Sequence, residues 1–194
     1  IILNTKDIDI TKITYTKPIK ERGYHRANIL YDNYETMSIQ SPPLKFNGIT
    51  NSILELTIPN NKGGRQKKFY SALYKIEQHA IHTTANNSKE WFGRQVSFDR
   101  IRNMFKSFIL TSETLTGAAG LRLRKSRDIE FYNESKELVE NMDTVHLTNV
   151  PLVCLCRVDG ILFGKNTAKL DIKIVQVKIE PPPVVKQNEV ENEV

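Results

Sequence analysis

Apolar and polar side chains alternate over several short stretches of the chain, which is the period-two pattern of half-buried strands. In the stretch 52–58, leucine and isoleucine alternate with Glu55 and Thr57. The same kind of pattern predicts further strands at 27–31, 36–40, 44–49, 121–124, 129–132, 150–158 and 170–179. Strands therefore precede and follow a central region that has a different period.

The central region has the period of a helix. Between Gln66 and His82, apolar residues are four, three and four positions apart, so they fall on one face of a helix. Ser97 is a suitable N-cap, and we expect a second helix from there to Leu110. The two helices form an insertion at about 66–110, followed by a flexible Gly-Ala-Ala-Gly break at 117–120.

The last predicted strand changes phase between Ile174 and Val175, as a β-bulge would require, and strongly curved or closing strands need such bulges. The order of strands, helices and strands differs from the regular alternation of a parallel α/β sheet. We therefore expect a mainly β protein with a helical insertion (α+β), built as an antiparallel barrel with about two helices. This domain should span 1–180, because the three prolines at 181–183 end the sheet and leave a mobile acidic tail at 181–194.

Composition favours a globular protein inside the cell. The chain has 194 residues, 39% of them hydrophobic, and no apolar run reaches the length that a membrane crossing requires. The first residues do not form a secretory signal. The only cysteines, Cys154 and Cys156, lie two positions apart on a predicted core strand, so a disulfide framework is not expected and a reducing compartment is.

Charge is distributed unevenly along the chain. The net charge is +6, but 181–194 contain Lys186 and three glutamates, so this tail carries −2 and the rest +8. A basic body suits a polyanionic partner, because lysine and arginine release counterions when they meet phosphates. A basic protein without such a partner is the alternative that charge alone leaves open.

Basic and aromatic residues are interleaved in the second half of the chain, which is the combination that single-strand binding needs: cations for phosphates and rings for bases. Arg122 and Arg124 share one face of a strand, and one of Phe131 and Tyr132, expected on the next strand, should face the core. The alternative is that the cations are solvated and the rings are core. The candidate nucleic-acid-binding residues are Arg122, Arg124, Lys125, Arg127, Phe131 and Tyr132, with Arg65, Lys67 and Lys68 second. A further basic group comprises Lys17, Lys20, Arg22, Tyr24, His25 and Arg26.

No motif for catalysis or cofactor binding is present. The glycines before Arg65 lack the spacing of a phosphate-binding P-loop, and the nucleophile and zinc-protease signatures are absent. His79 and His82 supply two imidazoles on one predicted helix, where a closed metal site needs about four ligands. We expect no enzyme activity, no cofactor and no metal.

Several short motifs occur in an order that resembles a known family. Trp91-Phe92-Gly93 is followed by matching stretches at 101–107, 121–124, 158–164 and 173–179, and then by the acidic tail. This order resembles the single-stranded DNA-binding proteins of nucleocytoplasmic large DNA viruses, which are similar to that of T-odd short-tailed phages. The tail departs from the family in ending with Glu193-Val194 instead of an aromatic residue.

The resemblance implies an OB-fold barrel that binds single-stranded DNA without sequence preference, in viral DNA replication, recombination or repair. We also expect replication proteins as partners of the tail, a homodimer as a further association, and a viral replication compartment in the cytoplasm or nucleus as the location. The alternative class is a virion structural, minor capsid or scaffold protein without enzymatic activity. For the tail, the alternatives are competition with DNA and a simple solubilising end.

Overall fold

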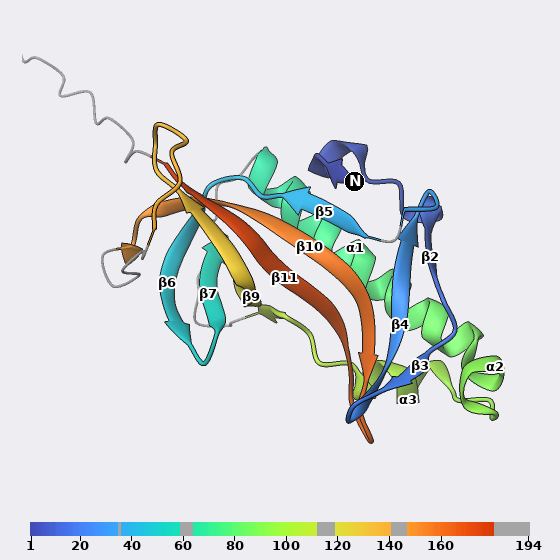
Figure 1. Ribbon diagram of the computed structural model, residues 1–194. Coiled ribbons are helices and arrows are strands. Elements are labelled where there is room, and N and C mark those ends of the chain that lie inside the picture. Colours follow the sequence, from blue (N-terminus) through green and yellow to red (C-terminus); the bar gives the residue numbers. More distant parts are fainter. Residues whose placement is uncertain (35, 59–63, 112–118, 141–146, 181–194) are drawn as a thin grey trace, which may run out of the picture.

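Five strands close into a barrel in the computed structural model, which describes all residues except 35, 59–63, 112–118, 141–146 and 181–194 (Figure 1). They follow the order β6–β7–β9–β11–β10, and the pairing of β10 with β6 closes the ring. Neighbours are antiparallel except β9 and β11, so the predicted antiparallel barrel contains one parallel pair. The strands are β6 (Leu44–Thr50), β7 (Ile53–Ile58), β9 (Ala119–Tyr132), β10 (Pro151–Phe163) and β11 (Ala168–Ile179).

The amino-terminal strands extend the wall of the barrel along β10. After its short pairing with β6, β10 pairs with β5 and then with β4. β2 and β3 pair with β4, and β1 lies parallel to β5. These elements are β1 (Ile2–Leu3), β2 (Ile13–Tyr15), β3 (Ile19–Glu21), β4 (Tyr24–Tyr31) and β5 (Met37–Gln40), with 3-10 helices at Thr5–Asp7 and Ile10–Lys12.

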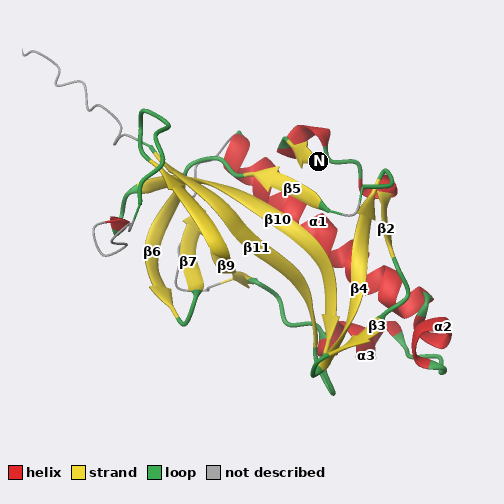
Figure 2. Cartoon of the chain, viewed as in Figure 1, coloured by secondary structure: helices red, strands yellow, loops and turns green. Residues whose placement is uncertain are grey.

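Three α-helices of the described chain are inserted between β7 and β9, and α1 runs along the far side of the sheet in Figure 2. They are α1 (Arg65–Asn86), α2 (Ser88–Phe92) and α3 (Phe98–Met104). The predicted stripe of α1 is confirmed, since Phe69, Leu73 and Ile76 are buried in the barrel core. The Ser97 hydroxyl accepts a hydrogen bond from the Arg100 amide at 3.4 Å, which confirms the N-cap of α3.

One prediction about the helical region was wrong, and one short helix was missed. The second helix was expected to reach Leu110, but α3 ends at Met104 and β8 (Ile109–Thr111) pairs with β9. The reason is that Phe108 and Ile109 pack into the barrel core, although the spacing of Phe108 also continues the helical stripe. The short helix α2 was not predicted.

The two histidines that were predicted on one helix both belong to α1. His79 stacks on Tyr15, and His82 stacks on Phe98.

The stretches 121–124 and 129–132 were predicted as two strands, but they belong to the single strand β9. Its pairing with β11 shows why the pattern breaks: Lys125 lies opposite Ile174 and Glu130 opposite Gln176. Four residues of β9, 126–129, therefore lie opposite the single residue Val175 of β11 and form a bulge.

The predicted flexible break at 117–120 was wrong in its second half, because Ala119 and Gly120 begin β9. Residues 117 and 118 lie outside the described residues.

The β-bulge predicted in the last strand is confirmed. Leu155 pairs with Gln176 and Cys156 with Ile174, so Val175 is the extra residue of β11. Cys154 and Cys156 are buried free thiols on the inner face of β10, as the pattern indicated. Burial raises the pKa of the Cys154 thiol to about 12, so this thiol stays protonated and unreactive.

One large core fills the barrel and extends to α1, and a smaller cluster joins the end of α1 to α3. No helix in the described part of the chain has the length and hydrophobicity needed to cross a membrane. Within the described ranges, no group of three or more His, Cys, Asp or Glu side chains is arranged to hold a metal ion. The predicted tail at 181–194 lies outside the described residues.

Candidate nucleic-acid interface

β9 presents two arginines on the outer surface of the barrel. Leu121 and Leu123 point into the core, so the alternating side chains of Arg122 and Arg124 are exposed. Arg122 lies opposite Glu55 of β7 and forms an exposed ion pair with it at 3.2 Å. Arg124 has no ion-pair partner within the described chain, so its charge is available to a ligand.

The bulge of β9 carries two more of the predicted cations. Lys125 is half-buried, and its backbone amide donates to the Ser52 carbonyl at 2.8 Å, which places it beside the β6–β7 turn. Arg127 is exposed within the bulge. Neither side chain has an ion-pair partner among the residues that the structure places. Arg124, Lys125 and Arg127 therefore form a run of unpaired positive charge along one strand.

Phe131 and Tyr132 were expected on the strand after the arginines, but both lie near the end of β9 itself. Phe131 packs against the barrel core. The Tyr132 hydroxyl donates to Glu130 Oε2 at 2.9 Å, and this hydrogen bond raises the pKa of the phenol. Tyr132 is thus the ring of this pair that faces away from the core, as strand geometry requires for neighbouring residues.

The strand register adds two cations that are not among the sequence-predicted site residues. Arg124 of β9 lies next to Lys173 of β11, and Lys173 lies next to Arg157 of β10. Because neighbouring strands are about 4.8 Å apart, these three side chains form a row across the sheet. We call this surface of β7, β9, β11 and β10 the outer face; it is defined by Glu55, Arg122, Arg124, Lys173 and Arg157. Only the pairing of strands distant in sequence reveals the row.

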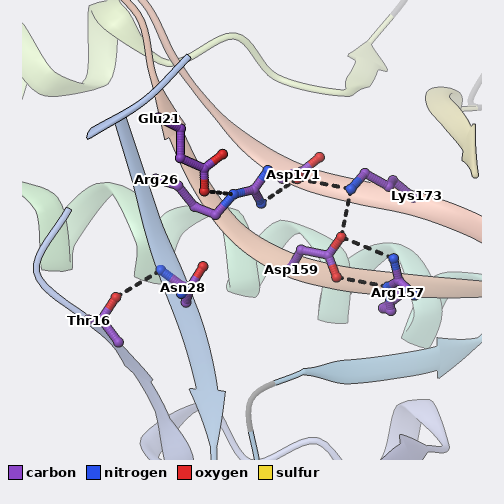
Figure 3. A network of polar contacts seen from close by, with 8 residues as sticks. All are labelled: Thr16, Glu21, Arg26, Asn28, Arg157, Asp159, Asp171 and Lys173. Atoms are coloured by element: carbon purple, nitrogen blue, oxygen red, sulfur yellow. Dashed lines mark hydrogen bonds and ion pairs between the residues drawn. The ribbon is translucent and has the colours of Figure 1, made fainter. Parts of the chain in front are cut away.

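A network of ion pairs lies at the β11–β10 side of the outer face and extends onto β4 (Figure 3). Arg26 of β4 donates to Asp171 Oδ2 at 2.6 Å and to Glu21 at 3.0 Å, and Lys173 Nζ lies 3.3 Å from the same Asp171 oxygen. The Asp171 side chain is only 2% exposed. The two cations therefore compensate a carboxylate that would be costly to bury alone.

Asp159 completes this network from β10. Its two carboxylate oxygens each lie 2.8 Å from a cation, one from Arg157 Nε and the other from Lys173 Nζ. The whole network is neutral, because it contains three cations and three carboxylates. The cations are Arg26, Arg157 and Lys173, and the carboxylates are Glu21, Asp159 and Asp171. It joins β3, β4, β10 and β11, whereas the excess positive charge of the outer face lies on β9.

The second-rank cations are located elsewhere. Arg65 and Lys68 of α1, together with Lys6, line a separate hollow of about 590 Å³ whose walls include no residue of β9. Lys67 is exposed and does not line that hollow. The structure thus does not bring Arg65, Lys67 and Lys68 together with the cations of β9.

The fold and the site together define the class of protein. A five-stranded barrel with this strand order and one parallel pair is an OB-fold, in which β6, β7, β9, β10 and β11 are the first to fifth strands. OB-folds bind oligonucleotides on the face of the second and third strands and on the loops between strands one and two and strands four and five. In this chain those parts are β7, β9, the turn at 51–52 and the loop at 164–167.

Solved structures share this fold. The single-stranded DNA-binding protein from bacteriophage Enc34, in a C-terminally truncated form, has a TM-score of 0.51 and 15% identity, with 89% of this chain and 96% of that chain covered. The single-stranded DNA-binding protein gp2.5 of bacteriophage T7 has a TM-score of 0.53 and 10% identity, covering 80% and 98%. No curated protein matches the sequence. At these identities the likeness establishes the OB-fold.

A family model matches residues 66–191, which is more than half of the chain. The chain belongs to this family, the family of unknown function DUF5871.

Proposed function

We propose that the protein binds single-stranded DNA, without sequence preference, on the outer face of its OB-fold barrel. The observation that carries the proposal is the run of unpaired cations on β9, Arg124, Lys125 and Arg127, because it lies on the part of the barrel that OB-folds use for oligonucleotides. The fold likeness to the phage proteins, which are single-stranded DNA-binding proteins by name, supports the choice of ligand.

The chemistry of the face suits a single strand. Cations on β9 would follow the phosphate backbone, and Tyr132 at the end of the strand offers an aromatic ring to an unpaired base. Phosphate contacts carry no sequence information and stacking tolerates every base, so the expected binding is strong at low salt and insensitive to sequence.

The biological setting that we propose is supported by the ligand and by the motif order of the second half of the chain. We propose a non-enzymatic role in viral DNA replication, recombination or repair, within a viral replication compartment. The resemblance to the proteins of nucleocytoplasmic large DNA viruses supports this setting, as does the likeness in fold to phage proteins. Replication proteins would be the further partners.

The first test is fluorescence anisotropy of a labelled single-stranded oligonucleotide and of its duplex over a salt series. The expected result is preferential binding of the single strand, with an affinity that falls steeply as salt rises. Absence of any preference, or no binding near physiological salt, would contradict the proposal and favour a structural component of the virion.

The second test removes the two arginines of β9. Arg122→Ala with Arg124→Ala should weaken single-strand binding and reduce the salt slope by about 1.4, since each phosphate contact contributes about 0.7 for single strands. A control variant, Lys75→Ala with Lys89→Ala, removes two exposed cations from α1 and α2 and should leave both quantities unchanged. An unchanged slope in the β9 variant would exclude these arginines from the site.

A further inference from the structure

A groove lies beside the outer face, and we call it the hairpin groove because two hairpins line it. It has a volume of about 1020 Å³ and lies between the β3–β4 hairpin, the β10–β11 hairpin and the helices α2 and α3. This volume lies at the upper limit of the roughly 300–1,000 Å³ typical of pockets for one small molecule. The chemistry of its lining therefore has to show which kind of ligand it suits.

The floor of the groove is aromatic. Trp91 and Phe92 of α2 both pack edge-on against the buried ring of Phe163, with ring centroids 6.1 and 5.3 Å apart. Trp91 and Phe92 remain half-buried and line the groove, and Tyr24 and His25 of β4 line it as well. Rings held in this way are fixed before a ligand arrives, as a stacking platform for bases requires.

The rim of the groove is positively charged. Its lining includes four exposed cations, and in the described part of the chain none of them has a carboxylate partner. The one lining carboxylate, Glu21, is already paired with Arg26. The groove therefore combines free positive charge with aromatic rings. The four cations are Lys20, Arg94, Arg100 and Lys165.

The groove borders the ion-pair network beside the outer face, because Glu21 lines the groove and pairs with Arg26. Lys165 belongs to the loop at 164–167, which joins the fourth and fifth strands of the OB-fold and flanks the binding face in such barrels. On the other wall, the Arg26 guanidinium lies 5.7 Å from the centroid of the Tyr24 ring while it binds Asp171 of the outer face. The groove lining thus contacts the Arg26 network on one wall and includes residues of the loop at 164–167 on the other.

We propose that the hairpin groove holds a segment of the same single strand of DNA that the outer face binds, with bases on Trp91 and Phe92 and phosphates at Arg94, Arg100 and Lys165. The inference rests on the proposed function and extends it, because it assigns a second part of the binding site and predicts its footprint. An acidic polypeptide is the competing occupant, and it offers charge without bases.

Trp91 is the only tryptophan of the chain, so its fluorescence reports on the groove directly. We would titrate the full chain with single-stranded oligonucleotides of about 6 and about 16 nucleotides, near the limits known for one OB-fold. Anisotropy would follow binding in parallel. The longer strand should quench Trp91 to saturation, and poly-glutamate at the same salt should not.

A charge variant provides the second readout. Arg94→Ala with Arg100→Ala should weaken binding of the longer strand about tenfold and lower its salt slope by about 1.4, while binding of the short strand changes less than twofold. The matched control is Lys89→Ala with Arg102→Ala, which removes exposed cations from α2 and α3 that do not line the groove. The control should bind both strands with the same affinity and the same salt slope as the unaltered chain.

The outcomes separate the two proposals. If neither oligonucleotide binds, the proposed function itself fails. If the longer strand binds by anisotropy but Trp91 emission is unchanged and the groove variant equals its control, the hairpin groove lies off the path of the strand. Quenching by poly-glutamate as strong as that by DNA would assign the groove to an acidic polypeptide and overturn the inference.

Discussion

Glu77 is a carboxylate inside the protein that has no cationic partner among the described residues. It is 5% exposed, and its Oε2 atom accepts a hydrogen bond from the Ser107 hydroxyl at 2.9 Å. Its Oε1 atom is buried and has no hydrogen-bond partner in the part of the chain that the structure describes. Burial raises the pKa of this carboxyl, against the opposing effect of the hydrogen bonds from Ser107 and Phe108. Protonation of Glu77 therefore favours the folded state.

We expect Glu77→Gln to raise the free energy of unfolding at pH 7.5 by about 1 kcal/mol, because it removes a poorly compensated buried charge. The folded-state pKa of Glu77 lies above the ordinary value of 4.5. The stability that the protonated carboxyl gives the folded state is therefore complete below about pH 4.5, and it is lost as the pH rises through the folded-state pKa. Urea unfolding at pH 7.5 and pH 4 measures this. The gain should vanish at pH 4, and Glu134→Gln, an exposed control, should change neither value. An equal gain at both pH values would contradict the explanation.

At this scale the sequence predicts the direction of a side chain but not its partner. Strand alternation was enough to place Arg122 and Arg124 on one face. It could not show that Arg26 pairs with Asp171, because these residues are 145 positions apart and meet only through the pairing of β4, β10 and β11. For the same reason, Arg157 and Lys173 were missed as neighbours of Arg124.

Among the elements, β10 depends on one glycine to pair with β4. Gly160 adopts a φ of +149°, and a Cβ atom at this position would overlap the carbonyl oxygen of Ala27 on β4. A register irregularity of β10 against β11 lies between Val158 and Gly160. The close approach of β4 to β10 therefore requires a residue without a side chain.

Gly160→Ala should destabilise the protein by roughly 3 kcal/mol, since the added carbon strains the backbone and also forces β4 away from β10. Gly48→Ala is the matched control, because Gly48 has a φ of +157° and no atom lies within 4 Å of its added Cβ. Thermal unfolding of both variants checks this, and equal losses would mean that the contact with Ala27 is unimportant.

The period of the apolar residues predicts an element well where the same period continues over the whole segment. The stripe of α1 and the bulge at Val175 were predicted from residues next to one another in the sequence, and both are confirmed. The end of α3 could not be predicted, because the spacing of Phe105 and Phe108 fits a helix equally well. The barrel core that takes up Phe108 is formed by distant strands.

For the whole molecule, the property that bears on competition with DNA is the contrast in charge between a basic body and an acidic end. Residues 1–180 carry a charge of +8 and 181–194 a charge of −2. A tethered anion near a cationic surface competes with phosphates at a high effective concentration. Such competition is strong only at low salt, because the Debye length falls from about 30 Å at 0.01 M to about 8 Å at 0.15 M.

Deletion of 183–194 should therefore tighten binding of single-stranded DNA several-fold at low salt and leave it nearly unchanged at physiological salt. Replacing Glu189, Glu191 and Glu193 by glutamine in the full chain should have the same effect, because it removes the charge and keeps the length. Anisotropy titrations at the two salt concentrations measure both variants. Equal affinity with and without the tail at low salt would exclude the competition.

The pairing of β10 with β4, β5, β6 and β11 has a consequence for the synthesis of the protein. The first three of these strands leave the ribosome long before β10 has been made, so the edges that β10 will cover stay open during elongation. Open strand edges are templates for association with other chains, and contacts between distant segments form slowly. The amino-terminal third of the protein thus cannot complete its folding until β10 has been made. Any chain that terminates before Pro151 retains an exposed sheet that is prone to association.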